Sequence, residues 1–284
     1  MKYIDLHVHS TASDGTLTPS EVVDHAVEVG LSAFALTDHD TLRGVAEAKE
    51  RAARHKANGH AIEVYSGVEI SAAYKERDIH ILGLLVDETN ENLDRALASF
   101  LENRNRRNDR MLERFAERGI ILTMEDLLED TPDSVITRAH FARALMKKGI
   151  VASVQEAFEK YVGDNGPCFV AREYMSPEQA ISVIRKAGGV PVLAHPLLYN
   201  LPHDELYALV ERLKTAGLKG IEVYYSNNRG QDEVNVKALA NHFGLVCTGG
   251  SDFHGAVKPA IELGSGKGNL KIPYSVLENV MSVK

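Results

Sequence analysis

Hydrophobic positions follow two spacings along most of the chain. Short apolar runs that predict β-strands lie at residues 3–6, 33–36, 63–68, 79–86, 190–194, 220–223 and 245–248. Apolar residues at helical spacing predict helices at residues 19–29, about 42–55, 177–187, around 206–213 and 232–243. Because strands alternate with helices, we expect parallel strands joined by helical crossovers. Seven such strands suit a barrel better than a small open sheet, so the predicted fold class is α/β.

The pattern changes to helices alone between Leu93 and about Gly163. A long, highly charged helix is predicted over residues 92–118, and shorter ones over 124–129, 138–148 and 153–161. A run of helices within a strand-and-helix series most simply indicates an inserted subdomain. We therefore expect a barrel formed by residues 1–92 and 164–284, with a helical insert at residues 93–163.

Composition narrows the classes of partner and compartment. The net charge is −8, from 32 basic and 40 acidic residues, which argues against stable DNA binding. Cys168 and Cys247 form no CxxC pair, as expected in a reducing compartment. No apolar run is long enough to span a membrane, and the first ten residues lack the apolar core of an export signal. We expect a cytoplasmic protein without a membrane partner.

The twelve histidines are many for 284 residues, and their positions are not scattered. Several histidines and carboxylates lie at predicted strand ends, mostly at the carboxyl ends, where parallel α/β proteins build their sites. An isolated HxH is a weak signal, and His80 alone could be a core histidine. The nine candidate ligands together are His7, His9, Asp14, His39, Glu69, His80, His195, Asp252 and His254.

The donor types restrict the metal. Imidazole mixed with carboxylate, without thiolate, suits manganese, iron(II) or zinc, and it fits neither a structural zinc site nor a calcium site. Nine ligands are too many for one ion, whereas a bridging carboxylate such as Glu69 allows two or three. Adjacent divalent ions activate water and stabilise the attacking and leaving oxygens of a phosphoryl displacement.

The motifs that carry these residues resemble the polymerase and histidinol phosphatase superfamily, a group of metal-dependent phosphoesterases. The resembling stretches are DLHVHSTASDGT from Asp5, LTDHDT, VEIS around Glu69, AHP at His195 and GSDFH ending at His254. The resemblance implies a distorted seven-stranded (β/α) barrel with a trinuclear site at its mouth. It assigns His7, His9, Glu69 and Asp252 to one ion, Glu69, His80 and His195 to the second, and Asp14, His39 and His254 to the third.

The insert is similar to that of one subfamily, through ITRAHFARALMKKG and FEKYVGDNGPCFV. Members hydrolyse 3′,5′-nucleoside bisphosphates to the 5′-monophosphate, and some trim RNA from its 5′ end. The resemblance implies substrate-binding roles for Thr137, Arg138 and His140, with Arg104 or Arg107 from the long helix. Arg138 begins a helix, where backbone N–H groups favour an anion, and Arg172 is a further candidate for phosphate binding.

Some of these positions have ordinary alternatives. Arg104, Arg107 and Arg110 at helical spacing also fit a solvated helix face. Tyr224 and Tyr225 follow a barrel strand, where they could contact a nucleoside or pack in the wall.

The expected reaction is removal of the 3′-phosphate, for example from adenosine 3′,5′-bisphosphate, by a metal-activated hydroxide. Glu69 and its ions would activate the nucleophile, and Asp14, His39 and His254 would hold the ion that orients the scissile phosphate. Manganese is the expected ion, with iron or zinc as alternatives. The group that protonates the leaving oxygen stays open between a metal-bound water and Asp40.

Three other activities stay open at this point. A 5′-3′ exoribonuclease acting on short RNA and a histidinol-phosphate phosphatase would share the metal site. An amidohydrolase would also begin with HxH on a barrel, but such enzymes commonly bridge their ions with a carbamylated lysine, where this chain has Glu69.

Overall fold

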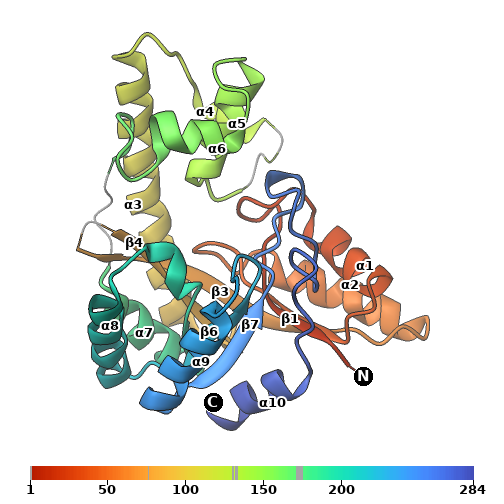
Figure 1. Ribbon diagram of the computed structural model, residues 1–284. Coiled ribbons are helices and arrows are strands. Elements are labelled where there is room, and N and C mark those ends of the chain that lie inside the picture. Colours follow the sequence, from red (N-terminus) through yellow and green to blue (C-terminus); the bar gives the residue numbers. More distant parts are fainter. Residues whose placement is uncertain (1, 76, 130, 132–133, 171–174) are drawn as a thin grey trace.

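Seven strands form one sheet that closes almost completely into a barrel (Figure 1). The computed structural model describes residues 2–75, 77–129, 131, 134–170 and 175–284. The strands are β1 (Ile4–Val8), β2 (Ala33–Leu36), β3 (Glu63–Tyr74), β4 (Arg77–Leu84), β5 (Val190–Leu193), β6 (Gly220–Tyr225) and β7 (Val246–Gly250), and each pairs with the next. The segment after β7 returns to β1, where Asp252 N donates to His7 O at 2.8 Å and His9 N donates to Phe253 O at 3.0 Å. The expected α/β barrel with seven strands is confirmed.

The prediction that all the strands run parallel is wrong for β4. β4 pairs antiparallel with both β3 and β5, whereas the other pairs are parallel. The reason lies in the length of β3, which continues to Tyr74 and pairs that residue with Arg77. Two residues can connect only antiparallel neighbours, since a parallel crossover needs a dozen or more.

Helices cover the outside and one end of the barrel. The predicted helices are confirmed as α1 (Pro19–Glu28), α2 (Val45–Ala57), α7 (Pro177–Lys186), α8 (His203–Ala216) and α9 (Asp232–Phe243), and all but α9 have shifted ends. Two 3-10 turns, η2 (Pro196–Tyr199) and η3 (Gly255–Val257), and the helix α10 (Ser275–Ser282) were not predicted. α10 packs Val276, Leu277 and Val280 into a core shared with Ile4 and Leu6. It covers the end of the barrel away from α4 and α5 (Figure 1).

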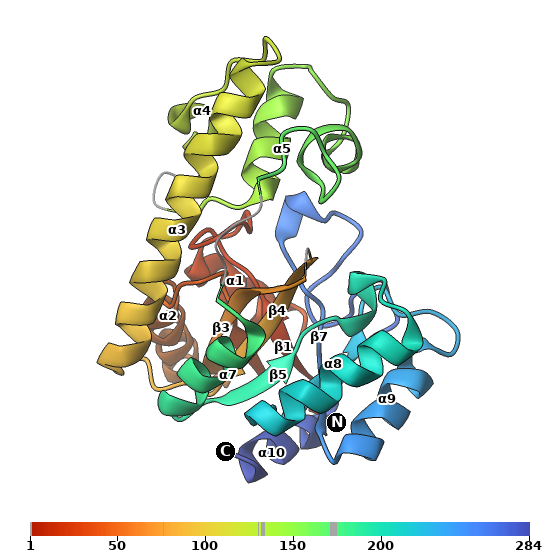
Figure 2. The same ribbon diagram turned by 90° about the vertical axis from the view of Figure 1, so that its left-hand side faces the viewer.

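The region between β4 and α7 is helical and has a hydrophobic core of its own. It contains α3 (Glu91–Ala116), α4 (Met124–Leu128), α5 (Arg138–Lys147), α6 (Val154–Ala157) and a π-helical turn, η1 (Phe158–Val162). Figure 2 shows α3 running along the barrel and continuing beyond it to α4 and α5. Phe115, Phe141 and Leu145 belong to the separate core, whereas Leu93 and Leu97 belong to the barrel core.

The division into a barrel and an insert at residues 93–163 stays a prediction. The packing of α3 favours a later boundary, because the first turns of this helix are part of the barrel. None of the described helices is both long and apolar enough to span a membrane.

Candidate metal centre

The nine predicted ligands converge at the end of the barrel that faces α5. His7 and His9 lie two residues apart on extended chain at the end of β1, so their rings share a face. His80 reaches the same rim from near the start of β4, because β4 runs antiparallel to its neighbours. His195 and Asp252 both have positive φ, 24° and 59°. Such backbone angles are uncommon outside glycine and concentrate at functional sites.

Glu69 lies at the middle of this cluster and is 1% exposed. Its Oε2 is 3.3 Å from His7 Nε2 and 3.2 Å from His9 Nε2. Asp252 Oδ1 faces the same two rings, at 3.7 Å from His7 and 3.5 Å from His9. The four residues that the resemblance assigns to one ion therefore direct their donor atoms at a common point.

The second oxygen of Glu69 faces two further histidines. Oε1 is 2.7 Å from His80 Nδ1 and 3.0 Å from His195 Nε2. Because its two oxygens face different sets of imidazoles, Glu69 has the geometry of a bridging carboxylate.

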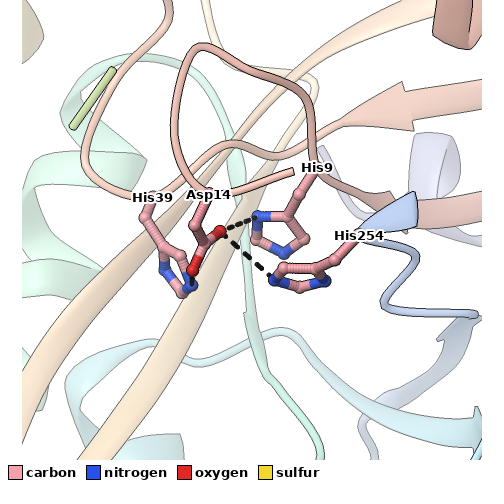
Figure 3. A group of neighbouring side chains, drawn as sticks. All are labelled: His9, Asp14, His39 and His254. Atoms are coloured by element: carbon pink, nitrogen blue, oxygen red, sulfur yellow. Dashed lines mark ion pairs between the residues drawn. The ribbon is translucent and has the colours of Figure 1, made fainter. Parts of the chain in front are cut away.

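Asp14 organises the third set of donors (Figure 3). Its Oδ1 is 3.2 Å from His254 Nε2, and its Oδ2 is 3.8 Å from His39 Nε2. His9 Nδ1 also faces this carboxylate, at 3.8 Å. His9 therefore lies between the first and third sets and could serve either.

Burial and mutual charge determine how these groups ionise. Burial alone would raise the pKa of Glu69, but the neighbouring imidazoles, chiefly His80 and His39, hold it well below its usual range. Burial also acts to lower the pKa of His80, yet Glu69 and Asp78 raise it to about 10. The pKa of His39 lies well below its ordinary value, because there burial prevails. The cluster thus presents ionised carboxylates to imidazoles in a largely buried site.

The residues present fit a metal centre. Buried ring nitrogens of His7, His9, His39 and His195 make no hydrogen bond within the described chain, which is costly unless another partner binds them. The donor atoms form three groups. Within each group the atoms lie within 4.8 Å of one another, and each group combines histidine with a carboxylate. Such a donor set suits divalent transition metals.

One residue that contacts two of the candidate ligands, Glu222, was not predicted from the sequence. Glu222, on β6, is fully buried. It lies 3.0 Å from His7 Nδ1 through one oxygen and accepts from His195 N at 2.7 Å through the other. A carboxylate on the second ring nitrogen fixes the imidazole's orientation and tautomer. An acidic residue within the otherwise apolar strand IEVYY was the available signal.

Asp252 has two further partners that were not predicted as such. Tyr225 donates its hydroxyl to Asp252 Oδ2 at 2.8 Å, and Lys258 Nζ lies 2.6 Å from the same oxygen. Tyr225 therefore orients a candidate ligand from within the wall of the barrel.

The helical region is hydrogen-bonded directly to the candidate ligand Asp14. Thr137, the N-cap of α5, donates its hydroxyl to Asp14 Oδ2 at 2.8 Å, and Arg143 donates to the Asp14 carbonyl oxygen at 3.0 Å. Val135 N also donates to Ala12 O at 3.1 Å. The start of α5 is thereby held over the metal centre.

A cavity of about 280 Å³ lies between this centre and the start of α5. Its wall combines candidate ligands with residues of the helical region and of the loop after β7. They are Asp14, His39, Ser71, Asp78, His80, Arg104, Thr137, Arg138, Ala139, Val154, Phe158, His254, Val257 and Lys258.

Arg138 extends into this cavity and is held there from two sides. Its guanidinium pairs with Asp164 at 2.6 Å and with Asp78 at 3.5 Å. The rings of Phe158 and Phe169 lie against it, with centroids at 5.7 and 5.4 Å. Arg138 is thus a pre-oriented cation next to the metal centre.

One alternative placed Arg104 and Arg107 on a solvated helix face. That alternative is wrong, because both residues are buried. Arg104 is fully buried and pairs with Asp40, and Arg107 is only 3% exposed. The reason is that α3 passes directly over the barrel rim. Arg104 does line the cavity, but its charge is already matched by Asp40, and that pairing argues against Asp40 as the proton donor.

His140 lies behind the cavity rather than in its wall. Its Nδ1 accepts from Thr137 N at 3.1 Å, and its Nε2 is 2.9 Å from Ser134 Oγ. Burial lowers the pKa of His140 to about 3. It is therefore a neutral capping residue of α5, and direct substrate contact is not supported. Arg172 lies outside the described residues.

Curated relatives match most of the chain, among them an exoribonuclease and a phosphatase. The 5'-3' exoribonuclease Rnm of Escherichia coli (strain K12) is 38% identical over 260 residues, covering 92% of this chain and 87% of the exoribonuclease. The 3',5'-nucleoside bisphosphate phosphatase of Chromobacterium violaceum is 37% identical over 257 residues, covering 89% of this chain and 88% of the phosphatase.

Two solved structures share the fold over nearly the whole chain. A Bifidobacterium adolescentis protein described as a metal-dependent phosphoesterase has a TM-score of 0.86 and 29% identity, covering 99% of this chain and 96% of its own. A Chromobacterium violaceum protein described as an amidohydrolase, with bound sulfate and no metal, has a TM-score of 0.87 and 33% identity, covering 98% and 96%. The family model of the PHP domain matches residues 5–174. With more than half of its length matched by that model, the chain belongs to the PHP domain family.

Proposed function

We propose that this protein hydrolyses the 3′-phosphate of 3′,5′-nucleoside bisphosphates and releases the 5′-monophosphate and inorganic phosphate. The broader class is firm: the chain is a phosphoric ester hydrolase of the PHP family with residues that can bind metal ions. In the proposed step a water oxygen bonds to phosphorus as the P–O3′ bond breaks, and the 3′-oxygen takes up a proton.

The cavity carries this proposal. It joins four candidate ligands, Asp14, His39, His80 and His254, to Arg138 at the start of α5. A substrate with one phosphate at the metal centre can therefore present a second phosphate to a planar guanidinium, which favours bidentate binding. The Chromobacterium phosphatase is named for a substrate with two phosphates. The solved Chromobacterium structure described as an amidohydrolase holds sulfate, a tetrahedral dianion like phosphate.

The chain's own residues position the reacting groups. When bound, divalent ions supply Lewis acidity that activates water and offsets the charge of the phosphate. Glu69, His7, His9, His39, His80, His195, Asp14, Asp252 and His254 would hold them. Glu222, Tyr225 and Thr137 orient three of these ligands, and the closed barrel wall keeps bulk water away from the buried side of the site.

Replacing Arg138 tests the proposed second-phosphate site. Arg138→Ala should raise KM for adenosine 3′,5′-bisphosphate by about tenfold or more, because a charge-assisted hydrogen bond is lost. KM for adenosine 3′-monophosphate, which lacks only the 5′-phosphate, should change by less than about threefold. Steady-state phosphate release measures both.

Arg110→Ala is the matched control, since Arg110 is exposed on α3 and does not line the cavity. Equal effects of Arg138→Ala on the two substrates would remove Arg138 from the second-phosphate site.

A 5′-phosphorylated oligoribonucleotide is the second candidate substrate, favoured by the identity to the E. coli exoribonuclease. The cavity volume, about 280 Å³, lies near the lower end of the range of about 300 to 1,000 Å³ usual for small-ligand pockets. Stepwise release of nucleotides from a short RNA, with a kcat/KM equal to that for the bisphosphate, would make the exoribonuclease activity the better description. Amide hydrolysis has no further support in the site, because Glu69 lies where a bridging lysine would be.

A further inference from the structure

Lys258 is a further cation in the cavity, and it comes from the segment after β7 rather than from the helical region. It follows η3 and lines the cavity together with Asp14, His39 and His254. Its side chain is 36% exposed, so the ammonium group can reach an incoming ligand.

The backbone of Lys258 is held firmly beside the loop that carries Asp14. Ala256 N donates to Thr16 Oγ1 at 2.9 Å, and Lys258 N donates to Gly255 O at 3.1 Å. Gly255 has a φ of +63°, and a Cβ there would lie 2.2 Å from Thr16 Oγ1. Only glycine permits this close approach, so the turn fixes where the lysine begins.

The contact that Lys258 makes in this structure is one that it can give up. Its Nζ lies 2.6 Å from Asp252 Oδ2, and Tyr225 donates to that same oxygen at 2.8 Å. If the ammonium group moves to a ligand, Asp252 Oδ2 keeps a donor and no buried oxygen loses its last hydrogen bond.

The other cations of the cavity wall are held in fixed positions. Arg104 is buried against Asp40, and Arg138 lies between Asp78 and Asp164. Lys258 faces the cavity beside the ligands and can pivot on its flexible stem, which suits binding of a phosphate as a point charge.

We propose that Lys258 binds the scissile phosphate, donating from Nζ to a non-bridging oxygen after leaving Asp252. This assignment rests on the proposed function only in taking the substrate to be a phosphate ester. It divides the cavity between two cations: Lys258 contacts the phosphate that every substrate has, and Arg138 contacts the second phosphate.

Calorimetric titration with inorganic phosphate tests the assignment without turnover. The protein is loaded with Mn²⁺, and its metal content is measured by mass spectrometry. Lys258→Met should weaken phosphate binding per loaded site by about tenfold, the loss expected for one charge-assisted hydrogen bond. Lys258→Arg should keep the affinity within about threefold.

Lys267→Met is the matched control, because Lys267 is exposed on the segment after β7 and does not line the cavity. It should leave phosphate affinity per loaded site within about twofold. If Lys258 acted only by holding Asp252, Tyr225→Phe, which removes the other donor to the same oxygen, would lower phosphate affinity per loaded site as much as Lys258→Met does. That result, or unchanged phosphate binding by Lys258→Met, would overturn the proposal, as would absence of phosphate binding by the unsubstituted protein.

Kinetics separate this proposal from the proposed function. Lys258→Met should lower kcat/KM for the bisphosphate and for adenosine 3′-monophosphate by the same factor, unlike Arg138→Ala. If the bisphosphate is not a substrate while Lys258→Met still weakens phosphate binding, only the proposed substrate is wrong. If the bisphosphate is hydrolysed and phosphate binding is insensitive to Lys258, only the role of Lys258 is wrong.

Discussion

Glu69 is the residue on which the candidate metal centre depends most. Its two oxygens face five imidazoles, those of His7, His9, His39, His80 and His195. No other carboxylate among the described ligands faces so many of the rings. Because Glu69 is buried, its carboxylate interacts with these imidazoles rather than with bulk solvent.

Glu69→Gln should therefore remove metal and activity together. The amide keeps the size of the side chain but loses the charge and one acceptor, so it cannot bridge two ions. We expect bound metal to fall by at least one ion per chain, by mass spectrometry, and kcat/KM to fall by about a thousandfold or more.

Glu63→Gln, at the exposed start of the same strand, is the control for general effects of the substitution. A Glu69→Gln protein with its full metal content would rule out the bridging role.

At the scale of elements, the contact between α5 and the metal loop is the informative one. Thr137 and His140 form a capping box at the start of α5, with histidine in the position where glutamate or glutamine is usual. The same Thr137 hydroxyl donates to Asp14. The cap of one helix thus also orients a candidate metal ligand.

The buried cap makes stability depend on pH. The unfolded chain takes up a proton on His140 near pH 6.5, whereas the folded chain does so only near pH 3. Stability is therefore complete above about pH 6.5 and is lost as pH falls toward 3, by about 2 kcal/mol at pH 5. His140→Gln should keep the cap and remove this loss.

Urea denaturation at pH 7 and pH 5 compares the two proteins. The unsubstituted protein should lose about 2 kcal/mol more than His140→Gln over that interval. Equal losses would mean that His140 is not held neutral in the fold.

Predictions for elements succeeded where local pattern decides structure. The helix at residues 232–243 and the strand at residues 33–36 were predicted with their observed bounds, since their apolar spacing is clear. The direction of β4 was not predictable from that spacing, because alternation does not tell a hairpin from a crossover. It depends on β3 continuing to Tyr74, through a segment that the sequence analysis left unassigned.

At the scale of the whole molecule, the metal centre should also hold the fold together. Its candidate ligands lie on or directly after six of the seven strands and are spread along the chain from His7 to His254. Ions that bind only the folded chain raise its stability in proportion to the logarithm of their free concentration.

Removal of metal by a chelator should lower Tm by about 5 °C or more. This follows because saturation at a hundred times Kd contributes about 2.7 kcal/mol, and each kcal/mol moves Tm by about 2 to 4 °C in a chain of this size. Differential scanning fluorimetry measures the shift, and adding back Mn²⁺, Fe²⁺ or Zn²⁺ separately compares the metals.

Glu69→Gln is the comparison, since it should hold fewer ions and its Tm should fall by less when the chelator is added. A Tm that the chelator does not change in the unsubstituted protein would mean that the ligands contribute nothing to folding.

The sequence by itself determined the residue types and their order along the chain. Histidines and carboxylates at successive strand ends predicted a metal site because strand ends meet at one rim, and all nine do meet there. Their division among ions, and the number of ions, stay predictions, since His9 faces both Glu69 and Asp14.

Only the tertiary structure showed which side chains form hydrogen bonds or ion pairs with the candidate metal ligands. The resemblance implied substrate-binding roles for Arg104 and His140, and these roles stay predictions. In the fold, Arg104 pairs with Asp40 at the edge of the cavity, and His140 caps α5 together with Thr137. Glu222 and Tyr225 reach His7 and Asp252 from β6, which is 215 residues from His7 and 27 residues from Asp252 along the chain. Spacing along the chain carries no information on such contacts, because they form only when the barrel closes and brings distant segments within hydrogen-bond distance.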